Sequence, residues 1–119
     1  MGKNELGAVG ENKAAVYLKR EGYMIVDRNY RCRMGEIDII ARKDGYIVFV
    51  EVKARKDASF AEAREFVTYA KQQRIIKTAM FWLSDHSCEL QPRFDVIEIY
   101  PSGAFLNSYK IEHIENAFM

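Results

Sequence analysis

Residues 35–55 of the chain read GEIDIIARKDGYIVFVEVKAR, and this stretch decides the fold. Two apolar segments, Gly35–Lys43 and Tyr46–Ala54, flank the dipeptide Asp44-Gly45. An Asp-Gly pair between two such segments is a strong signal for a two-residue hairpin turn. The stretch therefore predicts two antiparallel strands joined by a tight turn.

The turn determines which residues of the two strands face each other. Counting outward from it places Asp38 opposite Glu51 and Glu36 opposite Lys53. Residues opposed in this way point to the same face of a hairpin, so these four charged side chains share one face. A slip of one residue would reverse the facing of one strand relative to the other.

Two opposed carboxylates are unusual in a purely structural sheet, because like charges on side chains about 5 Å apart are destabilising. Isoleucine, valine and phenylalanine surround Asp38 and Glu51, which indicates a hairpin partly buried on both faces. Lys53 supplies one compensating charge, and a divalent cation such as Mg²⁺ or Mn²⁺ would supply the rest. The alternative is a solvated face with a Glu36–Lys53 ion pair, since charged residues usually mark the wet side of a sheet.

Asp38, Glu51 and Lys53 form a minimal set for metal-dependent phosphodiester hydrolysis. The metal activates water and neutralises charge on the phosphate, and a lysine beside it orients the water or stabilises the developing charge. We therefore predict that these three residues are catalytic and that the two carboxylates bind the metal.

The rest of the chain predicts two helices and three further strands. Apolar residues recur at helical spacing in Asn4–Glu21 and in Ala61–Ser84. The predicted strands are Tyr23–Asp27, followed by a basic connection over Arg28–Met34, then Arg93–Tyr100 and Ala104–Ile111. The order αβββαββ predicts an α/β domain with a mixed β-sheet flanked by helices, and the absence of a linker predicts one domain over residues 1–119. The expected apolar stripe of the second helix consists of Phe66, Tyr69, Ala70, Ile76, Met80 and Leu83.

Composition fits a folded, soluble protein, with 49% hydrophobic and 29% charged residues. Two cysteines far apart in sequence predict reduced thiols, and no apolar run is long enough for a membrane span, so we expect a cytoplasmic protein that does not contact a membrane. The net charge is only +1, so any basic footprint for nucleic acid must come from local clustering.

Basic residues cluster on both sides of the acidic hairpin in sequence. Their functional interpretation is contact with phosphates, and the alternative is ordinary solvated charge. The candidates for nucleic-acid binding are Arg28, Arg31, Arg33, Arg55 and Lys56. Gln73, on the stripe of the second helix, and Glu36 are candidate accessory residues, whereas Lys71, Arg74 and Lys77 are predicted to form a solvated face, and Asp95 is predicted to serve a salt bridge or cap.

Asp38 followed by Glu51-Val52-Lys53 resembles the D…(D/E)xK signature of the restriction-endonuclease-like, or PD-(D/E)XK, nucleases. Most of the chain also resembles the YraN family of small bacterial proteins, which are similar to archaeal Holliday junction resolvases. That wider resemblance rests on Gly10-Glu11…Ala14…Tyr17-Leu18, Arg28-Asn29-Tyr30-Arg31-Cys32-Arg33…Gly35-Glu36-Ile37-Asp38, Val48-Phe49-Val50-Glu51-Val52-Lys53 and Arg93-Phe94-Asp95-Val96. The combined pattern is specific, although ExK alone is weak.

The resemblance implies a restriction-endonuclease-like fold with Asp38 and Glu51 as ligands of Mg²⁺ or Mn²⁺ and Lys53 as the catalytic lysine. It also implies that Glu11, on the first helix, joins the site. Ile37 departs from the signature, which often has proline at this position.

The leading hypothesis is a metal-dependent endonuclease acting on DNA, with branched or junction DNA as candidate substrates. Two alternatives stay open: a nucleic-acid-binding module that does not cut, and an interaction subunit of a recombination or repair complex. A pure binding module has no need of an unfavourable acidic pair, which favours the enzyme. A homodimer is expected, because cutting two strands commonly uses two symmetric sites.

Overall fold

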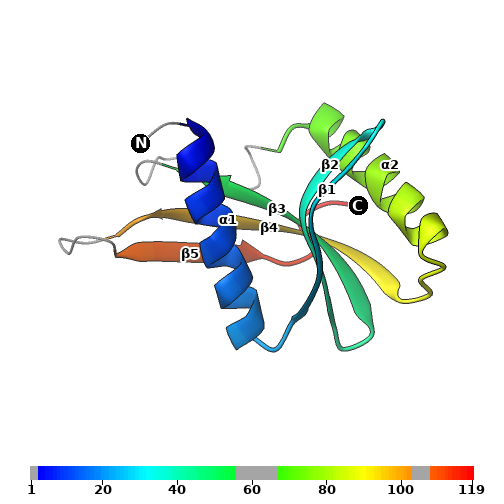
Figure 1. Ribbon diagram of the computed structural model, residues 1–119, viewed down its shortest axis with the longest axis horizontal. Coiled ribbons are helices and arrows are strands. Elements are labelled where there is room, and N and C mark those ends of the chain that lie inside the picture. Colours follow the sequence, from blue (N-terminus) through cyan, green and yellow to red (C-terminus); the bar gives the residue numbers. More distant parts are fainter. Residues whose placement is uncertain (1–2, 56–66, 103–107) are drawn as a thin grey trace.

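The structure is a computed structural model and describes residues 3–55, 67–102 and 108–119, without the side chains of residues 3–6. The order αβββαββ is the predicted one (Figure 1). The elements are α1 (Lys3–Arg20), β1 (Met24–Cys32), β2 (Gly35–Lys43), β3 (Tyr46–Ala54), α2 (Tyr69–Asp85), β4 (Gln91–Pro101) and β5 (Tyr109–Ile114).

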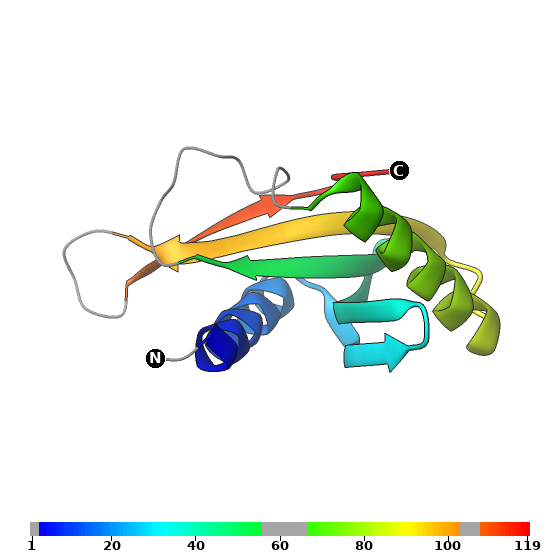
Figure 2. The ribbon, with the colours of Figure 1, turned by 90° about the horizontal axis from the view of Figure 1, so that it is seen from above.

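The five strands form one sheet in the order β1-β2-β3-β4-β5. Strand β3 is parallel to β4 and the other neighbours are antiparallel, so the sheet is mixed, as predicted. A parallel pair needs a crossover connection, and α2 lies in the one between β3 and β4. Figure 2 shows α1 and α2 on opposite sides of the sheet. In the described part of the chain, no helix is long and apolar enough to cross a membrane.

The β2–β3 turn has the predicted geometry. Asp44 and Gly45 have φ angles of 52° and 84°, and positive φ at both central residues is the requirement of a type I′ turn. The predicted register holds from Lys43–Tyr46 to Ile39–Val50.

Beyond Ile39–Val50 the two strands part, so the predicted register does not continue to the charged residues. Glu36 pairs with Arg31 of β1, not with Lys53, and their side chains form an ion pair of 2.9 Å. The alternative of a Glu36–Lys53 ion pair is therefore wrong. Side chains of β2 also stop alternating regularly between the two faces of the sheet here. Ile37 and Ile40 are three residues apart, so alternation would place them on opposite faces, yet they pack in the same cluster.

Three predicted boundaries differ from the described structure by at least three residues. Residues 28–32, predicted as a connection, continue β1 because they pair with β2. The predicted second helix starts too early: α2 begins at Tyr69, after Thr68 caps it by accepting a hydrogen bond from the Lys71 backbone N–H, and residues 61–66 lie outside the described part. Strand β5 ends at Ile114, three residues later than predicted, and residues 104–107 are not described.

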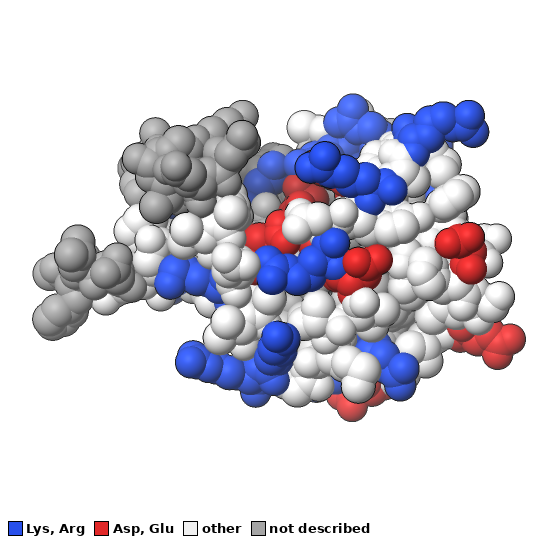
Figure 3. Space-filling view, viewed as in Figure 1, with Lys and Arg blue, Asp and Glu red and all other residues white. Residues whose placement is uncertain are grey.

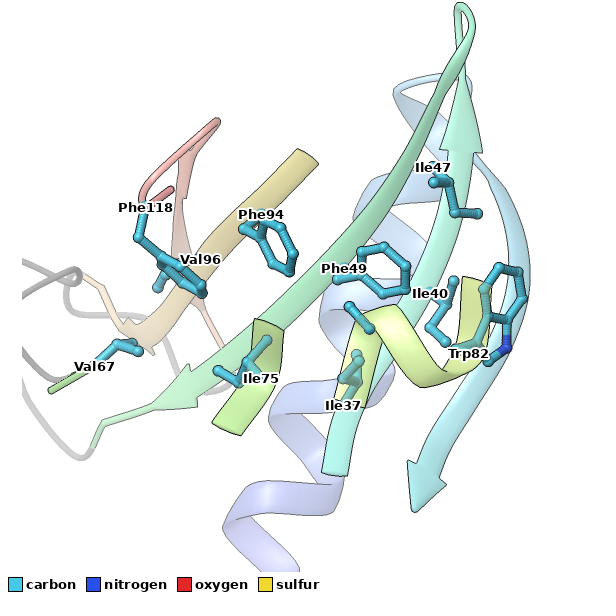
Figure 4. Close-up of a cluster of buried hydrophobic side chains, with 11 residues drawn as sticks. Ile37, Ile40, Ile47, Phe49, Val67, Ile75, Trp82, Phe94, Val96 and Phe118 are labelled. Carbon is cyan, nitrogen blue, oxygen red and sulfur yellow. The ribbon is translucent and has the colours of Figure 1, made fainter. Parts of the chain in front are cut away.

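Two apolar clusters hold the helices against the sheet. The α1 side contains Ala14 and Leu18 with Ile39 and Val50, and the α2 side is drawn in Figure 4. The buried face of α2 consists of Ile75, Thr78, Ala79 and Trp82. The predicted stripe was wrong for Tyr69 and Met80, which are 75% and 45% exposed, whereas Ile76 and Leu83 pack against the α2-side cluster as predicted. Phe66 lies outside the described residues. Because α2 carries apolar residues at helical spacing on two faces, the spacing alone does not identify the buried one.

A buried polar cluster joins β4 to β5 and α1. Asp95, fully buried, accepts two hydrogen bonds from the Arg93 guanidinium, of 2.9 and 2.8 Å, and lies 2.7 Å from Nε2 of His113. Nδ1 of His113 is 3.0 Å from the Tyr17 hydroxyl. Burial alone would raise the pKa of Asp95, but hydrogen bonds from His113 and Arg93 hold it below its ordinary value. The prediction of a salt bridge at Asp95 is confirmed.

Candidate active site

An open cleft of about 660 Å³ lies between α1 and the diverging ends of β2 and β3. Its lining residues are Gly7, Ala8, Glu11, Asn12, Arg28, Asn29, Arg31, Glu36, Asp38, Glu51 and Val52. Figure 3 shows acidic side chains near the middle of this face, with lysine and arginine side chains gathered around them. Four of the residues singled out from the sequence as catalytic, metal-binding or accessory candidates therefore share one cleft: Glu11, Glu36, Asp38 and Glu51.

Asp38 lies where regular pairing fails on both of its sides. Towards β3, the ladder ends at Ile39–Val50, and the Val52 N–H donates a 2.8 Å hydrogen bond to Oδ2 of Asp38. Towards β1, the ladder passes over Asn29, whose φ of 53° is a left-handed conformation that asparagine tolerates better than most residues. Such irregularities in a sheet are common beside active sites, where they direct a side chain.

The Asp38 carboxyl has a strongly shifted pKa. Burial and the nearby Glu51 carboxylate raise the pKa of Asp38 from 3.8 to about 7. Glu51 is itself only 7% exposed. The cleft therefore brings together two poorly solvated carboxyl groups, as the sequence predicted, although they are not partners in the β2–β3 ladder.

Two lysines approach Glu51. Its Oε1 lies 3.8 Å from Nζ of Lys53 and 2.5 Å from Nζ of Lys71. Burial and the neighbouring Lys71 lower the pKa of Lys53. For Lys71, burial also acts to lower the pKa, but hydrogen bonds to Glu51 and Lys53 outweigh it and the pKa is raised.

The sequence prediction missed Lys71, which was expected on a solvated face. A helix starting at Ala61 would place Lys71 in the middle of that helix, whereas α2 starts at Tyr69. A signal was available in the threonine at position 68, a residue type that favours the N-cap. Gln73 is half-buried on α2 and is not among the residues that line the cleft.

Helix α1 brings Glu11 into the cleft through a close approach at Gly10. A Cβ atom at Gly10 would lie 2.7 Å from Cβ of Ala54, so this contact with β3 requires glycine. Oε1 of Glu11 accepts hydrogen bonds from Arg28 and Asn29, of 3.1 and 2.9 Å. Within the described ranges, no three His, Cys, Asp or Glu side chains converge as a ready metal cluster, so the role of Glu11 as a third ligand stays a prediction.

The predicted phosphate-binding residues occupy different environments. Arg31 is highly exposed and forms an ion pair with Glu36, and Arg33 is exposed in the β1–β2 turn. Arg28 is held by Glu11, and Arg55 forms an ion pair with the buried Glu98. Lys56 lies outside the described residues.

The model of the uncharacterised protein family UPF0102 matches residues 10–99, which include all the residues that line the cleft except Gly7 and Ala8. The chain belongs to the UPF0102 family. The UPF0102 protein of Caldanaerobacter subterraneus subsp. tengcongensis is 45% identical over 117 residues, covering 98% of this chain and 96% of its own.

Other relatives in the UPF0102 family match the chain over a similar length. That of Thermodesulfovibrio yellowstonii is 45% identical over 118 residues, covering 99% of both chains. That of Geobacter metallireducens is 47% identical over 114 residues, covering 95% of this chain and 91% of its own. The names of these UPF0102 relatives state no activity.

The raised pKa of Asp38 predicts a pH-dependent stability. Between pH 3.8 and about 7 the folded protein holds a proton that the unfolded chain has released, so its stability falls as pH rises through this window. Asp38→Asn removes the effect and should raise the free energy of unfolding by roughly 1 to 3 kcal/mol at pH 8, with no gain near pH 4. Urea unfolding without metal, with the exposed Glu89→Gln as control, measures it. An equal gain at both pH values would contradict the assignment.

Proposed function

We propose that this UPF0102 protein is a metal-dependent endonuclease that hydrolyses phosphodiester bonds in DNA, with branched or junction DNA as candidate substrates. The observation that carries the proposal is the pair of poorly solvated carboxyl groups, Asp38 and Glu51, in one open cleft with Lys53 beside them. A structural role for this pair would be costly, because buried like charges destabilise a fold.

The donor set of the cleft fits a hard divalent cation. Asp38 and Glu51 would hold Mg²⁺ or Mn²⁺ through carboxylate oxygens, which these ions prefer, and Glu11 is the candidate third ligand. Burial and the Glu51 carboxylate destabilise the ionised form of Asp38, and a bound cation would stabilise it. The bound cation would supply Lewis-acid activation of water and neutralise charge on the phosphate.

The protein's own groups fix the remaining parts of the reaction. The Val52 N–H holds the Asp38 carboxylate in place, and Arg28 and Asn29 of β1 hold Glu11 of α1. Lys53, whose Nζ lies 3.8 Å from Oε1 of Glu51, would donate hydrogen bonds to the attacking water or to a phosphate oxygen, where negative charge grows in the transition state. The cleft is open to solvent, which fits a polymer backbone as the substrate.

A second candidate function is a non-catalytic nucleic-acid-binding or interaction subunit of a recombination or repair complex. The observation that favours it is the contact of both Lys53 and Lys71 with Glu51, which neutralises one carboxylate without any metal. The two functions differ in the need for a cation, so metal dependence separates them.

The test is a cleavage assay on labelled linear, nicked and four-way-junction DNAs. Mg²⁺ or Mn²⁺ should support cleavage of at least one of these DNAs, and EDTA should abolish it. Binding of the same DNAs without cleavage under any metal condition would favour the second candidate.

If Arg31 and Arg33, at the β1–β2 turn, contact phosphates, the affinity for DNA should depend on salt and not on base sequence. On duplex DNA, each phosphate contact contributes about −0.9 to the slope of log affinity against log salt concentration. The double substitution Arg31→Ala with Arg33→Ala should therefore flatten this slope by about two. Fluorescence anisotropy of a labelled junction across a salt series, in Ca²⁺ to suppress cleavage, measures the slope. An unchanged slope would mean that the DNA path lies elsewhere. Metal affinity at Asp38 and Glu51 should stay at the wild-type level in the double variant.

A further inference from the structure

Among the described residues, Lys71 forms the shortest ion pair with a carboxylate of the cleft, although α2 lies on the opposite side of the sheet from α1. Its Nζ lies 2.5 Å from Oε1 of Glu51, the same oxygen that Lys53 approaches at 3.8 Å. Glu51 is 7% exposed, whereas the Lys71 side chain is 32% exposed. The lysine thus reaches a buried carboxylate from a position that solvent still enters.

The backbone position of Lys71 does not favour a cation. Lys71 lies in the first turn of α2, where the Thr68 hydroxyl accepts its backbone N–H and where no acidic residue is present. The positive end of the helix dipole disfavours lysine in a first turn. The ion pair with Glu51 offsets this cost, so the placement of Lys71 is explained by the cleft and not by the helix.

The structure also offers a second position for the Lys71 ammonium. A smaller hollow of about 280 Å³, lined by Gly35, Glu36, Lys71, Arg74 and Ile75, lies beside the main cleft, and Glu36 lines both. A lysine has four rotatable carbon–carbon bonds and three donors, so its ammonium can leave Glu51 without movement of α2.

We propose that Lys71 holds Glu51 while the cleft is free of metal, and that a divalent cation displaces it, so that its ammonium then binds a phosphate of the DNA. The inference rests on the proposed function, because it requires a cation on Glu51. It adds a second lysine to the site and a reason for metal and DNA to bind cooperatively: the cation frees the donor that the phosphate uses.

The exchange couples metal binding to DNA binding, which a purely structural ion pair would not do. If Lys71 and the cation compete for one carboxylate, removing Lys71 tightens the metal site. In the wild type the cation frees Lys71 for DNA, and linkage requires DNA to raise metal affinity by the same factor by which the metal raises DNA affinity. A structural lysine would lower stability when removed but would not couple metal to DNA.

The test compares the full chain with Lys71→Met, Lys71→Gln and the charge-loss control Lys77→Met, an exposed residue further along α2 that lines neither the cleft nor the smaller hollow. Mn²⁺ titration by calorimetry should give Kd values about five- to tenfold lower for both Lys71 variants and within about twofold for Lys77→Met. Junction affinity by anisotropy should rise with Ca²⁺ in the wild type, and this rise should be lost in the Lys71 variants.

The outcomes separate this inference from the proposed function. Wild-type Mn²⁺ binding with unchanged Kd in both Lys71 variants would overturn the exchange and leave the nuclease proposal standing. A rise in junction affinity with Ca²⁺ that persists in both Lys71 variants would overturn it as well. No Mn²⁺ binding by the wild type or any variant would overturn the proposed function and the exchange with it.

Discussion

Lys53→Ala is expected to abolish DNA cleavage while the fold and the DNA affinity stay close to wild type. Lys53 lies 3.8 Å from Glu51, which lines the cleft, and burial and Lys71 lower the pKa of Lys53. An anionic phosphate beside Lys53 would stabilise its ammonium form. Loss of one donor that stabilises developing charge typically lowers a rate by about 10² to 10³. Single-turnover cleavage of the best DNA substrate in Mg²⁺ measures the effect.

The exposed Lys19→Ala, which removes the same charge from the outer part of α1, is the matched control and should cleave at the wild-type rate. A Lys53→Ala protein that also cleaves at the wild-type rate would show that Lys53 is only an ion-pair partner of Glu51. Circular dichroism and junction anisotropy on the same samples separate a catalytic defect from misfolding or lost binding.

Asp38→Asn and Glu51→Gln are each expected to weaken Mn²⁺ binding by about 100-fold, because each removes one charged oxygen ligand from a site with few others. Asparagine keeps an oxygen that can accept the Val52 N–H, so the hydrogen bond that positions this side chain survives the change. Calorimetric titration measures the affinity. Glu89→Gln, outside the cleft, should bind as the wild type does, and equal affinity in all four proteins would place the metal elsewhere.

The Asp38→Asn variant is expected to be more stable without metal and worse at binding it. A site that holds two carboxylates ready for a cation stores an unfavourable interaction until the cation arrives. The same substitution therefore has opposite expected effects on the free energy of unfolding and on metal affinity. Such opposition is typical of a functional site and not of a structural ion pair.

The sequence predicted the parts of the fold that depend on local signals. Asp44-Gly45 predicted the turn because few residues tolerate positive φ at two successive positions. The αβββαββ order predicted the mixed sheet, because a helix between two strands provides the crossover that a parallel pair needs. Asp38, Glu51 and Lys53 were singled out by spacing, and Asp38 and Glu51 line one cleft with Lys53 close to Glu51.

The parts that the sequence could not predict depend on tertiary contacts. Residues 28–32 are polar and lack strand alternation, and they form a strand because β2 offers hydrogen-bonding partners. The buried face of α2 was misassigned because Tyr69 and Met80 mimic a core stripe while Ile75 and Trp82 form the real one. Lys71 reaches Glu51 because the fold brings the first turn of α2 close to this residue, which no local pattern indicates.

The central claim is that the cleft around Asp38 and Glu51 cleaves DNA with a divalent metal. It is tested most directly by the cleavage of a labelled four-way junction and a linear duplex in Mg²⁺, by wild type and Glu51→Gln purified in parallel, so that a contaminating nuclease appears in both preparations. We predict cleavage by the wild type that EDTA stops and that Glu51→Gln lacks. Equal cleavage by both proteins, or no cleavage by either one, would contradict the claim.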